Sequence, residues 1–455
     1  MATPSSFLPI AQHRAQFEDL VTRALEHAKY LGATDAAAEV SESQGLAVSV
    51  RKGDVETVEQ TRDRSLDVTV FAGQRRGSAS TSDFSEAALR QTVEAAWHIA
   101  RFTAEDPAAG LPDADQLALG RNQDLSLHFP WGVSVGEATE LALRAEQAAR
   151  DVDPMITNTE GASVDSHEGH FVLGNTRGFL DGYAYSRHGL SVSPIAGRGQ
   201  RMQRDYWYTS DRDPSKLARP EEVGRYAAQR ALARLSARRI PTGRYPVLFE
   251  APLALGLIGA LTQAANGGSI YRQASFLVDA IGKQIFPAHV RLEENPFILG
   301  AMGSSAFDDE GVRTHARDVV KDGVLQGYFL STYTARKLGM VSSGNAGGSH
   351  NLMLTSSRTR RQDNLPAMLK KMGTGLLVTE LIGQGVNYVT GDYSRGAFGY
   401  WVENGQIRHA VEEITIAGNL KDMFMQVEAI GADVITRGSK SSGSILIAEM
   451  AVAGT

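Results

Sequence analysis

The hydrophobic and polar positions of the first hundred residues predict a helix, a group of strands and a second helix. Apolar side chains recur at helical spacing over residues 11–31, and Gly32 follows as a C-cap candidate. Ala37–Val50 alternates as a strand does, and Val55–Gln60 returns beside it across a tight turn. The unit is completed by two strands and a helix, at Ser65–Phe71, Gly77–Thr81 and 82–102.

Residues 125–238 repeat this order of helix, strands and helix. Turns are expected at Gly174-Asn175 and Asp181-Gly182. Between the two units, Asp106–Asp124 mixes Pro, Gly and Asp without periodicity and is interpreted as a linker. A helix is expected at Val135–Asp151, followed by a β-like stretch at Met155–Ser193 and an aromatic strand at Tyr206–Tyr208. The unit ends with a helix at Pro220–Ala237, which begins at proline.

Glycine becomes more frequent and strand patterns dominate after residue 239. The clearest pattern is a hairpin in which Asn404-Gly405 joins Phe398–Val402 to Ile407–Val411. The glycines 391, 396 and 399 indicate bulges, or places where another backbone such as a bound peptide comes close; a core sheet with glycine corners is the alternative. A second hairpin is expected at Arg313–Phe329, and helices are expected at Pro252–Ala265, Tyr333–Leu338 and Leu365–Met372. A flexible loop is expected at Ser342–Ser349, and a pair of short strands at Ala429–Val452.

These patterns predict an α+β fold. In this fold, N-terminal helix and strand units precede a glycine-rich, largely antiparallel β domain at the C-terminus. The expected divisions are an N-terminal domain, a linker, a middle domain and a C-terminal domain, at 1–105, 106–124, 125–238 and 239–455.

The composition of the chain excludes several kinds of chemistry. The 455 residues carry a net charge of -6 and no cysteine, which excludes disulfides, thiolate catalysis and cysteine ligands to a metal. The N-terminus shows no signal-peptide pattern, and Pro252–Ala265 is too short to span a bilayer. We therefore expect a cytoplasmic protein with neither a nucleic-acid nor a membrane partner. Two clusters of arginines, at 230, 234 and 238 and at 358, 360 and 361, are interpreted as solvated faces.

Two acidic or histidine-containing stretches are candidates for a metal site. In His167-Glu168-Gly169-His170 the context favours a strand or a turn, where residues three apart point to opposite faces, so we expect a surface or turn role. Asp308-Asp309-Glu310-Gly311 lacks the ligand alternation of a calcium loop and is interpreted as a solvated turn. Glu412-Glu413 alternates across a strand, so one of the two carboxylates is expected to face solvent.

Several longer stretches carry the motifs of one known family. They are Phe307–Gly311, Gly323–Tyr328, Ala335–Met340 with Gly344-Asn345, and, nearer the N-terminus, Val48–Val58 and Phe171–Gly178. With these motifs the chain resembles the TldD/PmbA family over nearly its whole length. Two further stretches, Thr390–Ala397 and Glu412–Leu420, resemble the PmbA branch, which is also called TldE.

The resemblance implies a cytoplasmic zinc peptidase system. In this family a TldD chain carries a helical His-Glu-x-x-x-His motif and a C-terminal cysteine as zinc ligands, and it pairs with a PmbA chain as a hollow heterodimer. Unfolded or short peptides enter and bind as an added strand. The implied roles are the maturation of peptide-antibiotic precursors and the degradation of an antitoxin, and an older label is modulator of DNA gyrase.

Carried over by position, the family's zinc helix falls on Pro252–Ala265. Ile258 and Gly259 stand where the first His and the Glu would be, Gln263 stands where the second His would be, and the cysteine has no counterpart. Isoleucine and glycine can neither bind zinc nor move a proton. We therefore expect no catalytic residue, metal ligand or cofactor in this chain, with zinc in a TldD-type partner, and a homodimer as an option for the isolated chain.

Two alternatives remain open at this stage. One is a metalloprotease with an unrecognised metal site, built from His315, His350 and His409 with nearby acids; the other is a non-proteolytic binding protein that modulates DNA gyrase. Two glycine-rich polar stretches, Ser342–Asn351 and Asn266–Arg272, are candidates for the lining of a peptide cleft. Mobile surface loops without such a role fit these stretches equally well. The residues chosen from these stretches are Asn266, Tyr271, Arg272, Ser343, Asn345 and His350.

Overall fold

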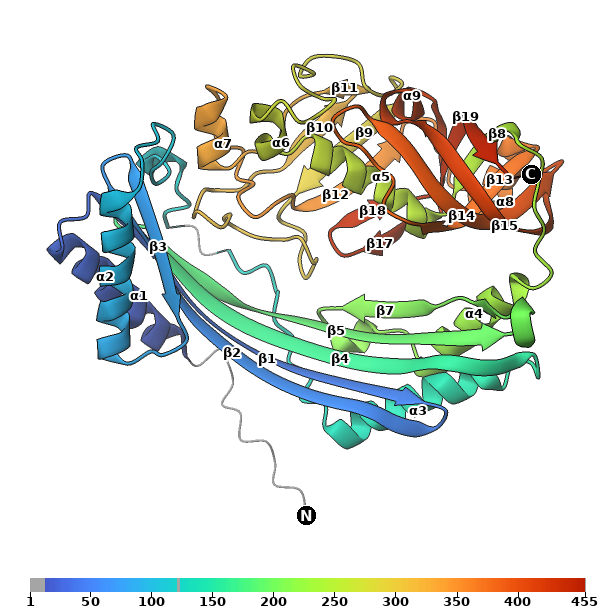
Figure 1. The fold of residues 1–455 in the computed structure, drawn as a ribbon, viewed down its shortest axis with the longest axis horizontal. Coiled ribbons are helices and arrows are strands. Elements are labelled where there is room, and N and C mark those ends of the chain that lie inside the picture. The colour runs from blue at the N-terminus through green and yellow to red at the C-terminus, as the bar shows by residue number, and fades with distance from the viewer. Residues whose placement is uncertain (1–12, 121–122, 455) are drawn as a thin grey trace.

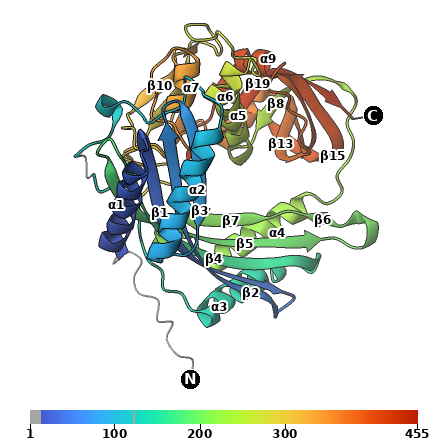
Figure 2. The same cartoon turned by 60° about the vertical axis from the view of Figure 1, so that its left-hand side comes forward.

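The computed structural model describes residues 13–120 and 123–454, which form a long curved sheet and a second, β-rich unit. Figures 1 and 2 show the C-terminal unit lying over the concave side of the sheet. This arrangement confirms the expected α+β fold class. The first two residues of the predicted N-terminal helix, the segment tested for a signal peptide and two residues of the expected linker lie outside the described residues.

The curved sheet has seven strands within the described residues, in the order β3-β2-β1-β4-β5-β6, with β7 also paired to β5. Its neighbouring strands are antiparallel. Because β1 pairs with both β2 and β4, the two N-terminal helix and strand units share one sheet. The strands are β1 (Asp35–Arg51), β2 (Asp54–Ala72), β3 (Arg75–Thr81), β4 (Ile156–Asn175), β5 (Leu180–Ala196), β6 (Gln203–Arg204) and β7 (Trp207–Asp211).

Four helices cover the face of this sheet that is turned away from the C-terminal unit. The apolar stripe predicted for the first helix, including Phe17, Leu20 and Val21, is buried against the sheet. Gly224 allows the third and fourth helices to pack closely, since a Cβ there would lie 2.2 Å from the Ala145 carbonyl oxygen. In the described part of the chain no helix is long and apolar enough to cross a membrane. The four helices are α1 (Arg14–Tyr30), α2 (Glu86–Phe102), α3 (Val135–Arg150) and α4 (Pro220–Ala233).

The sheet differs from its prediction in two places. Val55–Gln60 and Ser65–Phe71 belong to the single strand β2, which the pattern did not show because residues 54–64 are exposed on both faces and carry no alternation. The turn between β4 and β5 lies at residues 176–179, so Asp181-Gly182 is part of β5 and the turn predicted there is wrong.

The C-terminal unit contains two six-stranded sheets within the described residues. Most strand pairs are antiparallel, as expected, and β12–β18 and β8–β13 are parallel. The first sheet has the order β11-β10-β9-β12-β18-β17, with β9 (Val290–Asn295), β10 (Arg317–Lys321), β11 (Val324–Leu325), β12 (Asn351–Ser356), β17 (Ile435–Arg437) and β18 (Lys440–Ser442). The second has the order β15-β14-β13-β8-β19-β16, with β8 (Gly243–Phe249), β13 (Gly375–Ile382), β14 (Asp392–Glu403), β15 (Gln406–Asn419), β16 (Val427–Ile430) and β19 (Ile445–Ala453).

Short helices connect these strands, and one core contains side chains from both sheets and from α5. The predicted helices over 252–265, 333–338 and 365–372 are present as α5, α7 and α8, whereas 429–452 holds parts of four strands instead of the expected two. The helices of this unit are α5 (Ala251–Ala264), α6 (Gly267–Tyr271), α7 (Thr332–Lys337), α8 (Leu365–Met372) and α9 (Leu420–Met425). Short 3-10 turns lie in the preceding part of the chain at Ala114–Gln116, Gly199–Arg201 and Pro214–Lys216.

The hairpin predicted around Asn404-Gly405 is present and longer than expected, as β14 and β15. The ladder is bulged between Ala397 and Gly399, and a Cβ at Gly399 would lie 1.9 Å from the Leu377 carbonyl oxygen. The backbone that comes close to Gly399 is therefore the neighbouring strand β13 of the same chain. At this glycine the space considered for a peptide belongs to the core sheet.

The histidines of His167-Glu168-Gly169-His170 lie on opposite faces of β4, as their spacing predicts. The expected surface or turn role is wrong for Glu168 and His170, which are buried. The His170 ring stacks on Phe17 with 5.2 Å between ring centroids. Burial lowers the pKa of His170 to about 4, so this histidine is a neutral part of the core at pH 7.

One end of the sheet is joined to the C-terminal unit by buried ion pairs, which corrects the expectation of a solvated arginine stripe. Arg230 Nη1 lies 2.8 Å from Glu250 Oε1, and Arg234 Nη2 lies 2.6 Å from Glu380 Oε2. Both guanidinium groups also face Asp205, at 3.3 and 3.6 Å. These two arginines can be largely buried because three carboxylates, those of Asp205, Glu250 and Glu380, balance their charges there. Arg238 lies beyond the end of α4 and is exposed, as are Arg358, Arg360 and Arg361.

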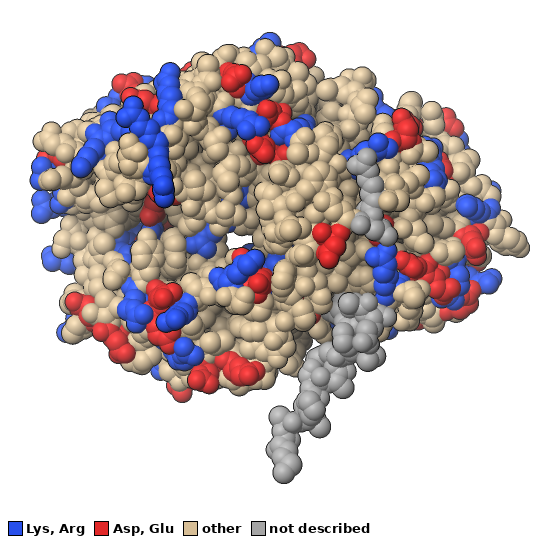
Figure 3. All heavy atoms as spheres, turned by 180° about the vertical axis from the view of Figure 1, so that it is seen from behind, with Lys and Arg blue, Asp and Glu red and all other residues tan. Residues whose placement is uncertain are grey.

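The other end of the sheet is joined by an aromatic cluster. Phe307 of the C-terminal unit packs against Phe171 and Phe179 at centroid distances of 6.1 and 4.9 Å. Between the two ends, Arg212 donates to the Ala301 and Met302 carbonyl oxygens, and Arg437 donates to Tyr208 O. The surface between these contacts is hollowed, and Figure 3 shows an opening through the molecule.

We expect the ion pairs at α4 to be required for stability. Arg234→Met keeps the aliphatic stem but removes the cation 2.6 Å from Glu380 and leaves Asp205 with Arg230 alone, which is expected to lower the unfolding free energy by about 3 kcal/mol. Arg239→Met removes an exposed pair with Glu413 and should cost less than about 1 kcal/mol. Urea denaturation followed by tryptophan fluorescence measures both. Equal effects of the two substitutions would contradict a specific role for the buried pairs.

Candidate functional site

Helix α5 places the three positions that the resemblance assigns to the zinc motif in different environments. Ile258 is 2% exposed and belongs to the core of the C-terminal unit, whereas Gln263 is exposed. Gly259 is half-buried, and a Cβ at this position would lie 3.9 Å from Lys440 Cε on β18. A cationic side chain therefore stands beside the position of the family's glutamate.

The histidines considered for an unrecognised metal site do not come together as a group of three. His409 lies on β15 in the second sheet of the C-terminal unit, away from the segment that holds His315 and His350. His350 is buried and its Nε2 lies 2.8 Å from the Gly344 carbonyl oxygen. Within residues 13–120 and 123–454, no three His, Asp or Glu side chains are arranged to hold a metal ion.

The cleft candidates Ser343, Asn345 and His350 belong to a hydrogen-bonded network instead of the flexible loop predicted at 342–349. Asn345 Nδ2 and the His350 backbone N–H both donate to Glu294 Oε1, at 2.8 Å each. Arg317 Nε lies 2.7 Å from Glu294 Oε2, and Ser343 Oγ donates to Asn345 Oδ1. Because Glu294 is 1% exposed, these contacts anchor the loop to β9 and β10.

The other cleft candidates lie on and around α6. Asn266 is the N-cap of this helix, and its side chain accepts from the Gly268 backbone N–H. The Tyr271 ring packs edge-on against Tyr333 of α7, with 6.0 Å between centroids. Arg272 is exposed and its guanidinium lies over the Tyr271 ring. These three side chains are more accessible than the loop group, and they adjoin α7, which forms one wall of a large cavity.

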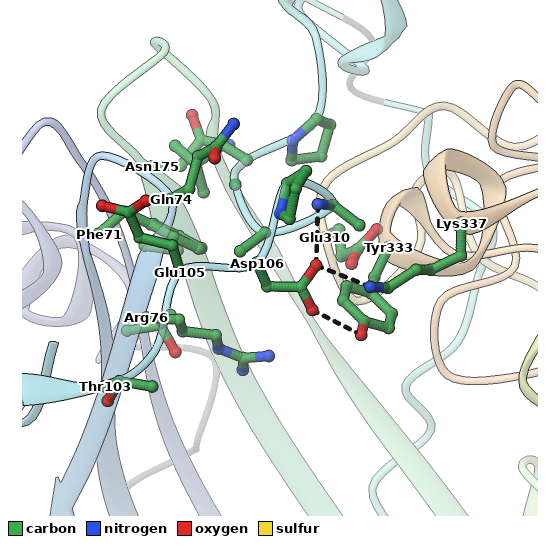
Figure 4. Close-up of a pocket in the computed structure, with 18 of the residues that line it drawn as sticks. Phe71, Gln74, Arg76, Thr103, Glu105, Asp106, Asn175, Glu310, Tyr333 and Lys337 are labelled. Carbon is green, nitrogen blue, oxygen red and sulfur yellow. Dashed lines mark hydrogen bonds and ion pairs between the residues drawn. The ribbon is translucent and has the colours of Figure 1, made fainter. Parts of the chain in front are cut away.

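That cavity lies where the end of the curved sheet, the segment 103–112 and the C-terminal unit meet (Figure 4). Its volume is about 660 Å³, within the range of about 300–1,000 Å³ that is typical of small-ligand sites. The expected linker is thus packed against the C-terminal unit and forms the roof of the cavity. The side chains that line it include Ala37, Thr69, Phe71, Gln74, Arg76, Glu105, Asp106, Pro107, Leu173, Asn175, Asp309, Glu310, Tyr333 and Lys337.

Four neighbouring strands contribute the floor in register. Thr69 of β2 lies opposite Ala37 of β1, and Ala37 lies opposite Asn175 of β4. Directly opposed residues point to the same face of an antiparallel sheet, so all three face the cavity. Two residues further along β2, Phe71 lies opposite Arg76 of β3. The floor therefore carries the guanidinium of Arg76 at one edge and the amide of Asn175 at the other edge. The side chains of Ala37, Thr69 and Phe71 lie between them.

One wall is a charged contact between the roof and α7. Asp106 Oδ1 accepts from Lys337 Nζ at 2.8 Å, and Oδ2 accepts from the Tyr333 hydroxyl at 2.8 Å. The Lys337 ammonium, with the Ala108 N–H and the Tyr333 hydroxyl, lowers the pKa of Asp106 to about 2. Glu310 Oε2 accepts from the Thr332 backbone N–H at the start of α7. The two contacts of Asp106 fasten the roof segment to the C-terminal unit.

Acidic side chains lie in the next row of the sheet, two residues further along the strands from Ala37 and Thr69. Glu39 of β1 lies opposite Asp67 of β2, and Asp309 of the C-terminal unit acts on Glu39 from across the cavity. Burial, together with the charges of Asp309 and Asp67, raises the pKa of Glu39 to about 7. Burial and the charge of Glu310 also raise the pKa of Asp309. Near pH 7 this row can take up or release a proton.

The solvated turn predicted at Asp308-Asp309-Glu310-Gly311 is wrong for Asp308, which is buried. Its carboxylate accepts from the backbone N–H groups of Glu310, Val312 and Ala346. Burial raises the pKa of Asp308 to about 7, against the effect of these three donors. The motif therefore ties the loop around Ala346 to the cavity wall.

Arg76, Asn175 and Glu39 were not predicted as site residues from the sequence. Asn175 lies within the motif Phe171–Gly178, and Glu39 is a charged residue on an alternating strand, but neither signal identifies a neighbour on another strand. Register between strands, which the single sequence does not show, brings these residues together. Glu412-Glu413 follows its prediction, since Glu413 is exposed and Glu412 accepts from Gln203 Nε2.

Comparison with protein families gives three matches that cover most of the chain. The models described as PmbA/TldA metallopeptidase domain 1, central domain and C-terminal domain match residues 36–100, 129–235 and 242–454. Metalloprotease PmbA of Escherichia coli O157:H7 is 49% identical over 449 residues, which cover 98% of each chain.

Solved structures share the fold. A protein of Bacteroides thetaiotaomicron described as a modulator of DNA gyrase superposes with a TM-score of 0.91 at 25% identity, covering 97% of this chain and 100% of that chain. TldE of Thermococcus kodakarensis superposes with a TM-score of 0.82 at 17% identity, covering 96% and 99%. The latter likeness concerns the fold alone.

The raised pKa of Glu39 leads to a pH-dependent stability. The folded chain keeps this proton up to about pH 7, whereas an unfolded glutamate loses it near pH 4.5, so stability falls as pH rises between these values. Glu39→Gln should remove this loss and stabilise the chain by on the order of 1–3 kcal/mol at pH 8, with little effect at pH 4.

Denaturant unfolding of both chains at a series of pH values measures this difference. The exposed Glu59 of β2 supplies a control, since Glu59→Gln should leave the pH profile unchanged. A Glu39→Gln profile parallel to that of the unsubstituted chain would contradict the raised pKa.

Proposed function

Because the chain belongs to the PmbA/TldD metallopeptidase family, we propose that it is the PmbA/TldE-type subunit of a zinc peptidase complex and is not catalytic by itself. A TldD-type subunit would complete the heterodimer and carry the zinc ion. The substrates would be unfolded or short peptides, such as a peptide-antibiotic precursor or an antitoxin, and the complex would act in the cytoplasm. A homodimer is an option for the chain without its partner.

The donor set on α5 is the observation that carries this proposal. A zinc ion needs imidazole, thiolate or carboxylate donors about 2.0–2.3 Å away. Ile258 offers an aliphatic side chain directed into the core, Gly259 offers none, and the nearby Lys440 adds a positive charge. The residues present do not fit zinc, so no catalytic step is assigned to them. The absence of cysteine from the chain supports the same conclusion.

The hollow between the curved sheet and the C-terminal unit supports a role in guiding peptides. A helix that has lost its ligands but remains packed in the core keeps the shape of the C-terminal unit. A chain of this shape can supply one wall of a chamber while the partner supplies the chemistry. Peptides would then contact both subunits, and Asn266, Tyr271 and Arg272, on and around α6, remain candidates for that path.

The metalloprotease alternative is less well supported, because His409 stands apart from His315 and His350. The gyrase-binding alternative has support from the described role of the Bacteroides thetaiotaomicron relative and from no feature of the site. It predicts a complex with gyrase that forms without a TldD-type chain.

Reconstitution tests the proposal. Cleavage of an unfolded peptide is measured with the purified chain, with a TldD-type partner and with the mixture, each with and without a zinc chelator. We expect chelator-sensitive cleavage in the mixture and none with the chain alone. Chelator-sensitive cleavage by the chain alone would overturn the proposal.

Substitution of two accessible candidate donors sharpens this test. Gln263→Ala and His315→Ala should each leave the activity of the mixture within about twofold, because neither side chain is assigned to zinc. A loss of a hundredfold or more in either variant, with unchanged assembly, would place a catalytic metal in this chain.

A further inference from the structure

We propose that the cavity under residues 103–112 binds the carboxylate end of a short peptide, three to four residues long. This inference rests on the proposed function, because it assigns the peptide a second contact on the non-catalytic chain. The contact lies on the curved sheet, whereas the degenerate zinc positions lie on α5. It would hold the end of a peptide after or during cleavage elsewhere in the complex.

Arg76 is the cation that would receive the carboxylate. It is exposed at the edge of the floor, and Figure 4 shows its side chain among those that line the cavity. Throughout the described part of the chain, no acidic side chain or carbonyl oxygen is within hydrogen-bonding or ion-pair distance of its guanidinium. A guanidinium group matches a carboxylate with two parallel N–H donors, which makes arginine suited to this terminus.

The acids nearest to Arg76 are already paired with other cations. Glu105 lies 3.2 Å from Arg75, and Asp106 lies 2.8 Å from Lys337. Their charges are therefore largely balanced within the protein. Of the described acids without a cation partner, Glu39 lies on β1 in the row of Asp67, and Asp309 and Glu310 line the cavity from the C-terminal unit, so none of them belongs to the β3 edge that holds Arg76. An incoming carboxylate thus meets a free positive charge at that edge.

The opposite edge of the floor offers a donor for a peptide carbonyl group. Asn175 is 5% exposed, and its Oδ1 already accepts from the backbone N–H groups of Arg177 and Phe179. Its Nδ2 has no hydrogen-bond partner among residues 13–120 and 123–454. An amide donor that lines a cavity without a protein partner is open to a ligand or a water molecule that accepts from it.

The spacing of the strands determines how long the ligand is. Arg76 and Asn175 lie on β3 and β4, three strand spacings of about 4.8 Å apart and two residues apart along the strands, so their backbones are roughly 16 Å apart. An extended peptide advances about 3.4 Å per residue, and the long side chain of Arg76 spans part of the distance, so a peptide of three to four residues fits between the two groups. Between the edges, the apolar side chains of Phe71 and Leu173 and the small Ala37 leave room for aliphatic side chains.

Calorimetric titration of the purified full-length chain, without its partner, tests the proposal. The probes are acetyl-Ala-Ala-Leu with a free carboxylate and the same peptide as a C-terminal amide. We expect saturable binding of the acid and binding of the amide that is at least about tenfold weaker, since a charge-assisted bidentate pair is lost. Equal binding of the two peptides, or no binding of either, would overturn the proposal.

Three variants locate the binding. Arg76→Gln should bring the affinity for the acid down to that for the amide, whereas Arg101→Gln, which makes the same charge change on the exposed end of α2, should leave the preference intact. Ala37→Leu fills the floor and should weaken both peptides by about tenfold or more. An undiminished preference in Arg76→Gln, in a chain that unfolds at the same urea concentration as the unsubstituted one, would refute the assignment.

The two proposals can fail separately. Stimulation of a TldD-type partner without peptide binding by this chain would remove the cavity proposal and leave the function intact. Peptide binding that depends on Arg76, without any cooperation in cleavage, would leave the cavity as a peptide site and remove the proposed role in the peptidase.

Discussion

The placement of the C-terminal unit depends on the need of two buried guanidinium groups for partners. Arg230 and Arg234 are covered by the C-terminal unit, and a buried charge without a counter-ion costs several kcal/mol. Glu250 and Glu380 of the C-terminal unit therefore have to lie beside these two arginines. At the far end of the sheet the Phe307 cluster makes an apolar contact that is less directional. With both ends attached, the curvature of the sheet leaves the space in which the hollow and the cavity lie.

The cavity depends on a second set of contacts between the same units. Asp106 joins the roof segment to Lys337 and Tyr333 of α7, and Asp308 ties the neighbouring turn to the loop that Asn345 and Glu294 anchor. Residues from β1, β2, β3 and β4 then face residues of the C-terminal unit across a space of defined shape. Motifs that look like solvated turns in the sequence thus serve to hold the cavity together, and they leave the side chains of Arg76 and Asn175 available.

Elements with a strong local signal could be predicted from sequence. The hairpin at Asn404-Gly405 and the stripe of α1 follow from turn chemistry and periodicity, and α5 follows from its apolar run. The length of β2 could not be predicted, because a strand exposed on both faces has no alternation. The burial of Arg230 and Asp308 was missed for a different reason: a charged residue reads as solvated unless its distant partners are known. The cavity floor combines four strands, and only their register reveals it.

Helix α5, on which the resemblance places the family's zinc motif, is here a structural element of the core. Ile258 adds to the packing of α5, and Lys440 lies beside Gly259, so we propose that the chain keeps the fold of its family without the donors for zinc. The zinc content of the assembled heterodimer, measured by mass spectrometry of the metal against protein concentration, tests this account most directly. The account predicts one zinc ion per heterodimer, located in the TldD-type subunit. Two zinc ions per heterodimer, one of them retained by this chain after separation, would contradict it.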